Sequence, residues 1–256
     1  MHPYTHIFGL ELPTYGLLIG LGTLLCFLML EFTPKHRYVT SDDAFSCALC
    51  CAVCGLLGAK LLYIIVEYKA LFADPIGFLK SVITGGFVFY GGLIGGIGGA
   101  LLFLKRHKIP FSSMADVLLP PFALVHAFGR IGCHMAGCCY GMELDTPISI
   151  VFPSGVGSFA PTGVPLIPTQ MMEAIFLFCL CFYLYRTLVK DNRSGIIMGK
   201  YTLYYAIWRF LIEFLRNDER GAVLFLSTSQ AISILLIPVG IYFIKNAKVK
   251  IKNLAL

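Results

Sequence analysis

HAFGRIGCHMAGCCYG, residues 126–141, ends a long apolar run and combines one arginine with three cysteines, two histidines and four glycines. The guanidinium of Arg130 stays charged at any ordinary pH. A charge inside the hydrocarbon of a membrane costs at least about 2.5–3.5 kcal/mol, so an arginine there is a candidate functional residue with a buried partner. The apolar sequence around this stretch therefore decides both the fold class and the meaning of Arg130.

The composition is that of an integral membrane protein. Of 256 residues, 57% are hydrophobic and 13% are charged, whereas soluble domains carry about 25% charged residues. The first ten residues contain no Lys or Arg, so we expect no cleavable signal peptide. The net charge of +6 comes from basic residues between apolar runs, where membrane orientation explains them, and we expect no nucleic-acid partner.

Seven apolar runs are long enough to cross a membrane, which takes about 20 residues each. They cover residues of about 13–32, 44–66, 86–104, 114–135, 169–188, 197–216 and 229–245. We predict an all-α, polytopic membrane protein that forms a single integral-membrane domain over residues 1–256. The third run is rich in glycine, which predicts close packing of helices.

The basic residues predict the orientation of these spans. The loops after the first, third and fifth runs, together with the C-terminal tail, hold 13 of the 20 Lys and Arg residues. The loop of residues 136–168 holds none. The positive-inside rule then places the N-terminus outside and the C-terminus in the cytoplasm, in agreement with seven spans. Loop 136–168 is external and is expected to form a lid or to lie along the membrane surface.

This orientation brings polar side chains from six spans to one depth in the outer half of the membrane. They are Tyr15, Lys60, Tyr90, Arg130, Glu173, Arg209 and Glu213. Planar arginine forks suit phosphate oxygens, and the basic groups outnumber the acids, so we predict a cavity for an anionic lipid headgroup. The alternative is that Arg209–Glu213, one helical turn apart, and Arg130–Glu173 are ion pairs that only hold the helices together.

Six segments, in this order, carry a resemblance to a known family. They are LPTYGLLIGLG (12–22), GAKLLYIIVEY (58–68), FYGGLIGG (89–96), Asp116 with Pro120 and GRIG (129–132), PTQMMEA (168–174), and YAIWRFLIEFLRND (205–218). Together with the topology they resemble the prolipoprotein diacylglyceryl transferases of bacterial inner membranes.

The resemblance implies a transferase of lipoprotein biosynthesis. Such an enzyme moves a diacylglyceryl group from phosphatidylglycerol to the lipobox cysteine thiol of a prolipoprotein, forming a thioether and releasing glycerol phosphate. Its partners are membrane lipids and the signal-peptide region of the precursor, its site faces the outer leaflet of the cytoplasmic membrane, and no cofactor is expected. Carried over by position, Arg130 and Arg209 bind the phosphate and Glu213 orients Arg209. The remaining carried-over site residues are Tyr15, Tyr205 and Gly141.

Several positions depart from the family pattern. Tyr90 stands where the family has histidine, Cys133 and Ala136 replace asparagines, and Cys138 replaces a glutamate. A phenol, with a pKa of about 10, is a poor base for the acceptor thiol. His126, one turn before Arg130, and His134, at the outer end of the span, are candidate bases, although either residue fits a packing role. A transferase with the same phospholipid donor and a different acceptor is therefore an alternative.

The cysteines leave further alternatives open. Cys133, Cys138 and Cys139 lie beside His134, where small filling side chains, a disulfide or a metal site are all chemically possible. A lipid- or metal-binding membrane protein without catalysis is the corresponding alternative function. Four cysteines of the second run, Cys47, Cys50, Cys51 and Cys54, share one helix face and are expected at a helix–helix seam.

Overall fold

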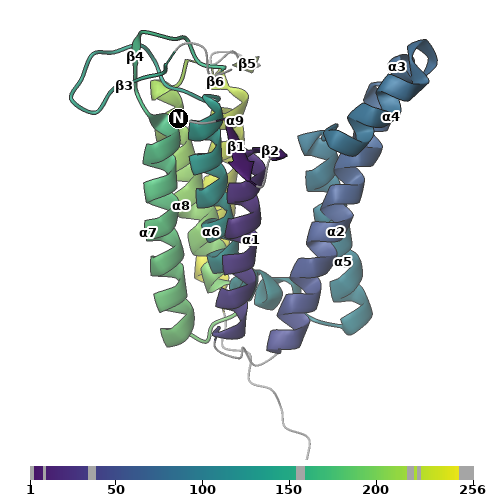
Figure 1. Cartoon of the computed structure of the whole chain (residues 1–256). Coiled ribbons are helices and arrows are strands. Elements are labelled where there is room, and N and C mark those ends of the chain that lie inside the picture. The colour runs from purple at the N-terminus through teal and green to yellow at the C-terminus, as the bar shows by residue number, and fades with distance from the viewer. Residues whose placement is uncertain are drawn as a thin grey trace, which may run out of the picture. The chain divides into compact units, whose positions relative to one another are not determined.

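The computed structural model describes residues 3–7, 10–33, 39–153, 159–217, 222–223 and 226–247. The chain is mostly helical (Figure 1) and divides into two compact units, residues 1–34 with 115–256 and residues 35–114. The single domain over residues 1–256 stays a prediction. Some basic residues behind the predicted orientation lie outside the described residues: Lys35, Arg37, Arg220, Lys248, Lys250 and Lys252.

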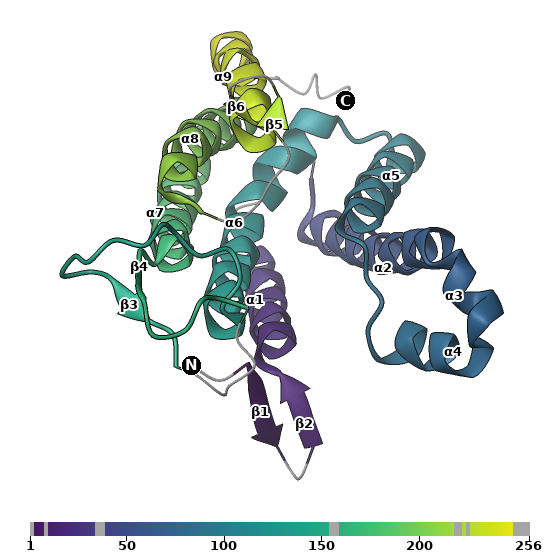
Figure 2. The same ribbon diagram turned by 90° about the horizontal axis from the view of Figure 1, so that it is seen from above.

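The first unit is a bundle of five long helices. They are α1 (Thr14–Glu31), α6 (Phe111–Ala136), α7 (Thr169–Lys190), α8 (Ile196–Ile212) and α9 (Thr228–Asn246), with a 3₁₀ turn η1 (Glu213–Leu215) after α8. Helix α8 packs against both α7 and α9, as the two views show (Figures 1 and 2). Apolar side chains of α7 and of the start of α8 form a buried cluster: Leu180, Leu184, Leu188, Ile196 and Ile197.

The second unit is built from α2 (Ser41–Val66), α3 (Tyr68–Ala73), α4 (Pro75–Thr84) and α5 (Phe89–His107). Helices α2 and α5 meet backbone to backbone, because a Cβ atom added at Gly58 or Gly95 would collide with the facing chain. The predicted close packing through glycine is confirmed. The Cys50 thiol lies 3.6 Å from the carbonyl of Gly99, so the predicted seam position of these cysteines is confirmed as well.

Five of the described helices, α1, α2, α6, α7 and α9, are long and apolar enough to cross a membrane. The all-α membrane class is therefore confirmed. Helices α5 and α8 overlap the other two predicted spans, but α5 ends in Lys105, Arg106 and His107, and α8 has 17 residues before it tightens into η1. Seven spans and their orientation stay predictions.

Within the described ranges, three short antiparallel hairpins accompany the helices. They are β1 (Tyr4–Ile7) with β2 (Leu10–Pro13), β3 (Ile150–Val151) with β4 (Pro165–Leu166), and β5 (Ala222–Val223) with β6 (Leu226–Ser227). The predicted external loop contains β3 and β4 and forms its own small apolar cluster around Phe152 and Leu166, each 1% exposed. A loop that buries side chains of its own forms a compact, ordered structure.

Asp116 of α6 fixes where α8 begins. Its fully buried carboxylate accepts hydrogen bonds from the backbone N–H groups of Gly195, at 2.5 Å, and Met198, at 2.9 Å. These donors lie at the N-terminus of α8, where backbone N–H groups lack partners within the helix. Asp116 therefore caps α8 from a helix about 80 residues earlier in the chain, and so sets the position of the polar residues near the other end of α8.

Candidate functional site

A buried carboxylate at the start of α7 is the centre of the site. Glu173 is fully buried. Its Oε1 lies 3.0 Å from Nη2 of Arg130 on α6 and accepts a 3.0 Å hydrogen bond from the Tyr205 hydroxyl of α8. Its Oε2 lies 3.8 Å from Nη1 of Arg209 and 4.0 Å from Nη1 of Arg216. One carboxylate therefore contacts three guanidinium groups.

The end of α8 supplies a second carboxylate. Glu213, in η1, lies 2.7 Å from Arg209 Nη2 and 4.0 Å from Arg216 Nε through its Oε2. Arg209 also donates a 3.0 Å hydrogen bond to the Ser229 hydroxyl of α9. The predicted pairs Arg130–Glu173 and Arg209–Glu213 both form, and Glu173 joins them into one group. We call the five residues Arg130, Glu173, Arg209, Glu213 and Arg216 the arginine cage.

The arginine cage is almost closed to solvent and carries excess positive charge. Its glutamate side chains are 0% and 6% exposed, and its arginine side chains are 14%, 9% and 3% exposed. Three guanidinium groups over two carboxylates leave a net charge of +1. Buried charges are costly unless they are paired, so the cage favours an anion whose oxygens accept hydrogen bonds from guanidinium groups, such as a phosphodiester.

Arg216 is the cage residue that our reading of the sequence missed. Arg216 is the last residue of the predicted run 197–216 and was not among the predicted site residues, yet its side chain is 3% exposed. A signal was present in the spacing, because Arg216 follows Glu213 by three residues and shares its helical face. Ser229, which accepts a hydrogen bond from Arg209, was also missed, and no spacing in the sequence pointed to it.

Gly141 lets two distant segments close over the cage. Its N–H donates a 3.0 Å hydrogen bond to the carbonyl of Ile167, and Gly141 pairs with Arg216 in an antiparallel bridge. A Cβ at this position would lie 2.6 Å from the Ile167 carbonyl oxygen and 2.8 Å from that of Leu215. Only glycine permits this approach, which holds the backbone of Arg216 in place.

Tyr15 and the two histidines lie around the cage with weaker contacts. Tyr15, in the first turn of α1, is 44% exposed, and its ring packs against Gly132 of α6. The His126 ring lies 5.3 Å from the ring of Tyr205, and the His134 ring lies 5.9 Å from that of Phe152. Within the described part of the chain, neither histidine Nδ1 has a hydrogen-bond partner. Neither is placed by these contacts as a base, so both assignments stay predictions.

Three thiols lie next to the cage. The Sγ atoms of Cys133, Cys138 and Cys139 are within 4.8 Å of one another, and none of them forms a disulfide. Hydrogen bonds from the thiols of Cys133 and Cys138, together with Arg216, lower the pKa of the Cys139 thiol. Arg216 thus connects this cysteine cluster to the arginine cage.

Lys60 and Tyr90 belong to the second unit and are described within it. The Lys60 ammonium donates hydrogen bonds to the carbonyls of Val82 and Gly85 and lies 4.1 Å from the centre of the Phe87 ring. Tyr90, at the start of α5, is 66% exposed. The prediction that these two residues share a cavity with the arginine cage stays a prediction.

Helices α7 and α8 also line an open apolar groove of about 420 Å³. Its lining residues are Phe176, Cys179, Leu180, Tyr183, Tyr204, Ile207, Trp208 and Leu211. The rings of Phe176 and Trp208 stack at 4.5 Å, and Trp208 directly precedes Arg209 of the cage. The same two helices therefore present an apolar groove and an anion-binding cage.

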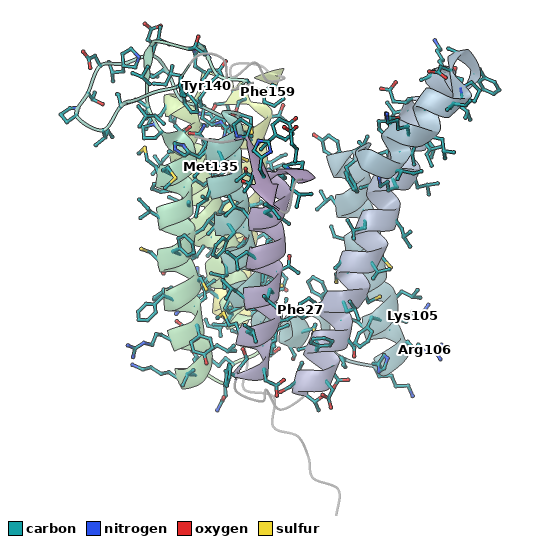
Figure 3. All side chains as sticks on the ribbon, viewed as in Figure 1. Phe27, Lys105, Arg106, Met135, Tyr140 and Phe159 are labelled. Atoms are coloured by element: carbon teal, nitrogen blue, oxygen red, sulfur yellow. The ribbon has the colours of Figure 1, made fainter. Side chains whose placement is uncertain are left out.

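The wider view with side chains shows the end of the bundle to which these groups belong. Met135 and Tyr140, labelled in Figure 3, flank Cys138 and Cys139 in sequence and lie at the upper end of the helices, where the loop of residues 136–168 covers the bundle. Helix α6 ends there and α7 begins there (Figure 1). Arg130 and Glu173 meet at this end because each lies within two turns of it.

Comparison with known proteins gives the site a context. Residues 3–245 match the family described as prolipoprotein diacylglyceryl transferase. The chain belongs to this family. Phosphatidylglycerol–prolipoprotein diacylglyceryl transferase 2 of Clostridium perfringens is 42% identical over 244 residues, covering 95% of this chain and 94% of that protein. The enzyme of the same name, without the number, from Clostridium tetani is 41% identical over 92% of this chain and 93% of that protein.

A more distant relative shows the same full-length match. The phosphatidylglycerol–prolipoprotein diacylglyceryl transferase of Clostridium botulinum is 31% identical over 94% of each chain. The resemblance read from the six segments is thereby confirmed.

Proposed function

We propose that this chain transfers a diacylglyceryl group from phosphatidylglycerol to the lipobox cysteine thiol of a prolipoprotein, forming a thioether and releasing glycerol phosphate. The observation that carries the proposal is the arginine cage, in which three buried guanidinium groups share two carboxylates. Its excess charge of +1 matches a phosphodiester. The donor and acceptor are those named for the relatives that match nearly the whole chain.

Arg130 and Arg209 bind the donor phosphate in this proposal. In the reaction the acceptor sulfur forms a bond to the glyceryl carbon while the bond from that carbon to the phosphate oxygen breaks. Negative charge grows on the departing phosphate, and preorganised guanidinium groups stabilise it. Glu173 and Glu213 hold the arginines in position, at 3.0 Å from Arg130 and 2.7 Å from Arg209. Tyr205 positions Glu173, and Tyr15 and Gly141 border the site.

The apolar groove between α7 and α8 accepts an acyl chain of the donor. Its lining is apolar and aromatic and includes Trp208, the sequence neighbour of Arg209. A phospholipid that enters sideways from the membrane would place its phosphate at the cage and one acyl chain along these helices. Such a division between charged and apolar contacts is typical of lipid sites, since each part of the ligand is desolvated by a matching surface.

A base must remove the proton of the lipobox thiol, because the thiolate is the nucleophile. Tyr90, His126 and His134 are the candidate bases. Lys60 is a further residue that binds the phospholipid donor in this proposal. Glutamine variants of His126 and His134 test two of them. Turnover at the wild-type rate in one variant would exclude that histidine as the base.

We further propose seven spans, with the N-terminus outside, the C-terminus in the cytoplasm and the site facing the outer leaflet of a bacterial cytoplasmic membrane. The distribution of Lys and Arg supports this orientation. It places the cage on the side where the signal-peptide region of an exported lipoprotein precursor becomes available.

Transfer by purified protein tests the proposal. The protein is given phosphatidylglycerol and a lipobox peptide, and mass spectrometry follows the diacylglyceryl adduct. Arg130→Ala and Arg209→Ala should each lower the rate by about 10²–10³, as loss of one transition-state donor does. Arg193→Ala is the control, because Arg193 pairs at 2.7 Å with Asp191 outside the cage. An unchanged rate in both cage variants would overturn the proposed phosphate site.

The same assay addresses a different acceptor, which the tyrosine at position 90 motivates. If the peptide is not modified but glycerol phosphate is released when cell extract is added, the donor assignment stands and the acceptor assignment is wrong. Release that disappears in Arg130→Ala would assign this activity to the cage.

A further inference from the structure

The turn that ends α6 brings two cysteines together. Gly137 has a φ of +71°, and its N–H donates to the carbonyl of His134 at 3.2 Å, while the N–H of Cys138 donates to the carbonyl of Cys133 at 3.0 Å. This pair of bonds defines a Schellman motif, whose first and last residues have side chains in contact. Here the contacting side chains are the thiols of Cys133 and Cys138.

The third thiol joins them through an unusual backbone conformation. Cys139 has a φ of +63°, in the left-handed region, which costs a non-glycine residue about 1–2 kcal/mol. Such strain persists at functional sites where the surroundings hold it in place. A cysteine that only fills space would not need this conformation.

The start of α7 holds the strained turn. The Gln170 amide donates to the carbonyl of Cys138 at 2.8 Å, and the Thr169 hydroxyl donates to the carbonyl of Cys139 at 3.0 Å. Both donors are buried, at 1% and 0% exposure. The backbone of the cysteine cluster is therefore fixed by neighbours that do not themselves offer a sulfur or a charge.

The geometry of the sulfur atoms suits a metal ion. They lie within 4.8 Å of one another, and thiolates bound to zinc at about 2.3 Å in a tetrahedral site are about 3.8 Å apart. Arg216 hydrogen-bonds to Cys139 and is 3% exposed, so its charge offsets one of three thiolate charges. Among the described residues, no histidine, aspartate or glutamate joins the group at this spacing.

We propose that Cys133, Cys138 and Cys139 form a three-thiolate site for a thiophilic d¹⁰ cation such as Zn²⁺, whose fourth position receives the acceptor thiol. Three protein ligands and one open position are typical of catalytic zinc. The part of this inference that concerns the acceptor rests on the proposed function. The bound cation would promote loss of the acceptor thiol's proton, a step for which Tyr90 is a poor base.

In the proposed reaction the acceptor thiol is first deprotonated and then alkylated. A thiol that coordinates a cation loses its proton, here to water. Its sulfur then donates an electron pair to the glyceryl carbon, the bond from that carbon to the phosphate oxygen breaks, and its electron pair stays on the phosphate held by the arginine cage. The neutral thioether binds the cation weakly and leaves. Arg216 contacts the cysteine cluster and belongs to the cage. The acceptor thiol and the donor phosphate would therefore be bound on either side of this one residue.

Metal content of the purified full-length protein tests the site without reference to activity. Reduced protein is loaded with Zn²⁺, titrated against a chelator and analysed by mass spectrometry for bound metal. We expect one Zn²⁺ per chain. Cys133→Ser and Cys139→Ser should weaken binding by more than about 100-fold, since even outer-shell partners are worth about 10–100-fold. Cys50→Ser is the control, because its thiol lies 3.9 Å from that of Cys54 in another thiol group.

A spectrum of the wild-type protein guards against variants that fail to fold. Cd²⁺ bound by three thiolates gives a sulfur-to-metal charge-transfer band in the near ultraviolet. A band of three-thiolate intensity supports the site. Absence of stoichiometric Zn²⁺ and of the band, or equal Zn²⁺ affinity in well-folded Cys139→Ser, would overturn it.

A lipobox peptide separates the two parts of the inference. A peptide with cysteine should strengthen the charge-transfer band, and the same peptide with serine should leave it unchanged. No change with either peptide overturns the acceptor role. Transfer at the wild-type rate by metal-free protein would sink that role while the proposed function stands. A metal-loaded protein that binds the peptide and forms no adduct would instead count against the proposed function.

Discussion

Glu173 shows how one buried residue can hold a charged site together. Its two oxygens contact Arg130, Arg209 and Arg216, and it also accepts a hydrogen bond from Tyr205. Each of these partners lies outside α7, the helix that carries Glu173. Because the carboxylate is fully buried, water cannot replace it for any of the three guanidinium groups.

Glu173→Gln should therefore destabilise the protein strongly. Removing one partner of a buried ion pair costs about 3–5 kcal/mol, because the remaining charge stays buried without compensation. Thermal unfolding in detergent measures the loss. Glu143→Gln, at an exposed position of the loop of residues 136–168, is the control and should change stability by less than about 0.5 kcal/mol. Similar unfolding temperatures for the two variants would contradict the role of Glu173.

Arg216 should matter for transfer as much as the two predicted arginines. Its guanidinium lies 4.0 Å from both Glu173 and Glu213, so Arg216→Ala removes positive charge from the cage. We expect the transfer rate to fall by about 10² or more, with partial recovery in Arg216→Lys, which keeps the charge but loses the planar fork. A rate like that of the Arg193→Ala control would mean that Arg216 serves structure alone.

At the scale of elements, the cap from α6 to α8 determines where the charged end of α8 lies. Asp116→Ala leaves the N–H groups of Gly195 and Met198 without their acceptor, and a buried unsatisfied donor costs about 1–3 kcal/mol. We expect lower stability and, because Arg209 shifts with α8, slower transfer. Asp42→Ala is the control, because Asp42 is exposed at the start of α2 and Thr40 with Asp43 makes the cap there. Loss of stability in Asp42→Ala alone would refute the assignment.

The close approach at Gly141 gives a second prediction for an element. A Cβ there would lie within 3 Å of two backbone carbonyls, and overpacking of this kind costs about 1–3 kcal/mol. Gly141→Ala should separate the bridge to Arg216 and slow transfer. Gly16→Ala places its Cβ with no atom within 4 Å and should keep wild-type transfer. Equal rates in the two variants would show that the bridge is dispensable.

For the whole molecule, the predicted orientation can be read from reporter fusions. A fluorescent protein that matures only in the cytoplasm should fluoresce when fused after residue 256 or inserted at Asn192. Alkaline phosphatase, which is active only outside, should be active when inserted at Glu143. Three predicted spans separate Glu143 from the C-terminus, so reporters at these two positions should lie on opposite sides of the membrane. Phosphatase activity at Asn192 would refute seven spans in the predicted order.

Periodicity and composition were enough to predict the helices and part of the site. Long apolar runs require membrane helices, because backbone polar groups have no other partners in lipid. The glycine-rich run predicted close packing, which α2 and α5 show. Arg209 and Glu213 were predicted to pair because their spacing of four residues places them on one helical face, and they lie 2.7 Å apart.

Only the tertiary structure decided that Glu173 contacts three guanidinium groups, because the sequence predicted its pairing with Arg130 alone. Arg130, Glu173 and Arg216 come from segments about 40 residues apart, and no local period relates them. Their meeting depends on how α6, α7 and α8 pack and on the bridge at Gly141. The same holds for Cys139, whose left-handed backbone is held by donors from α7. Spacing along one helix is a local property that the sequence by itself determines, whereas a site shared by several helices exists only after they pack.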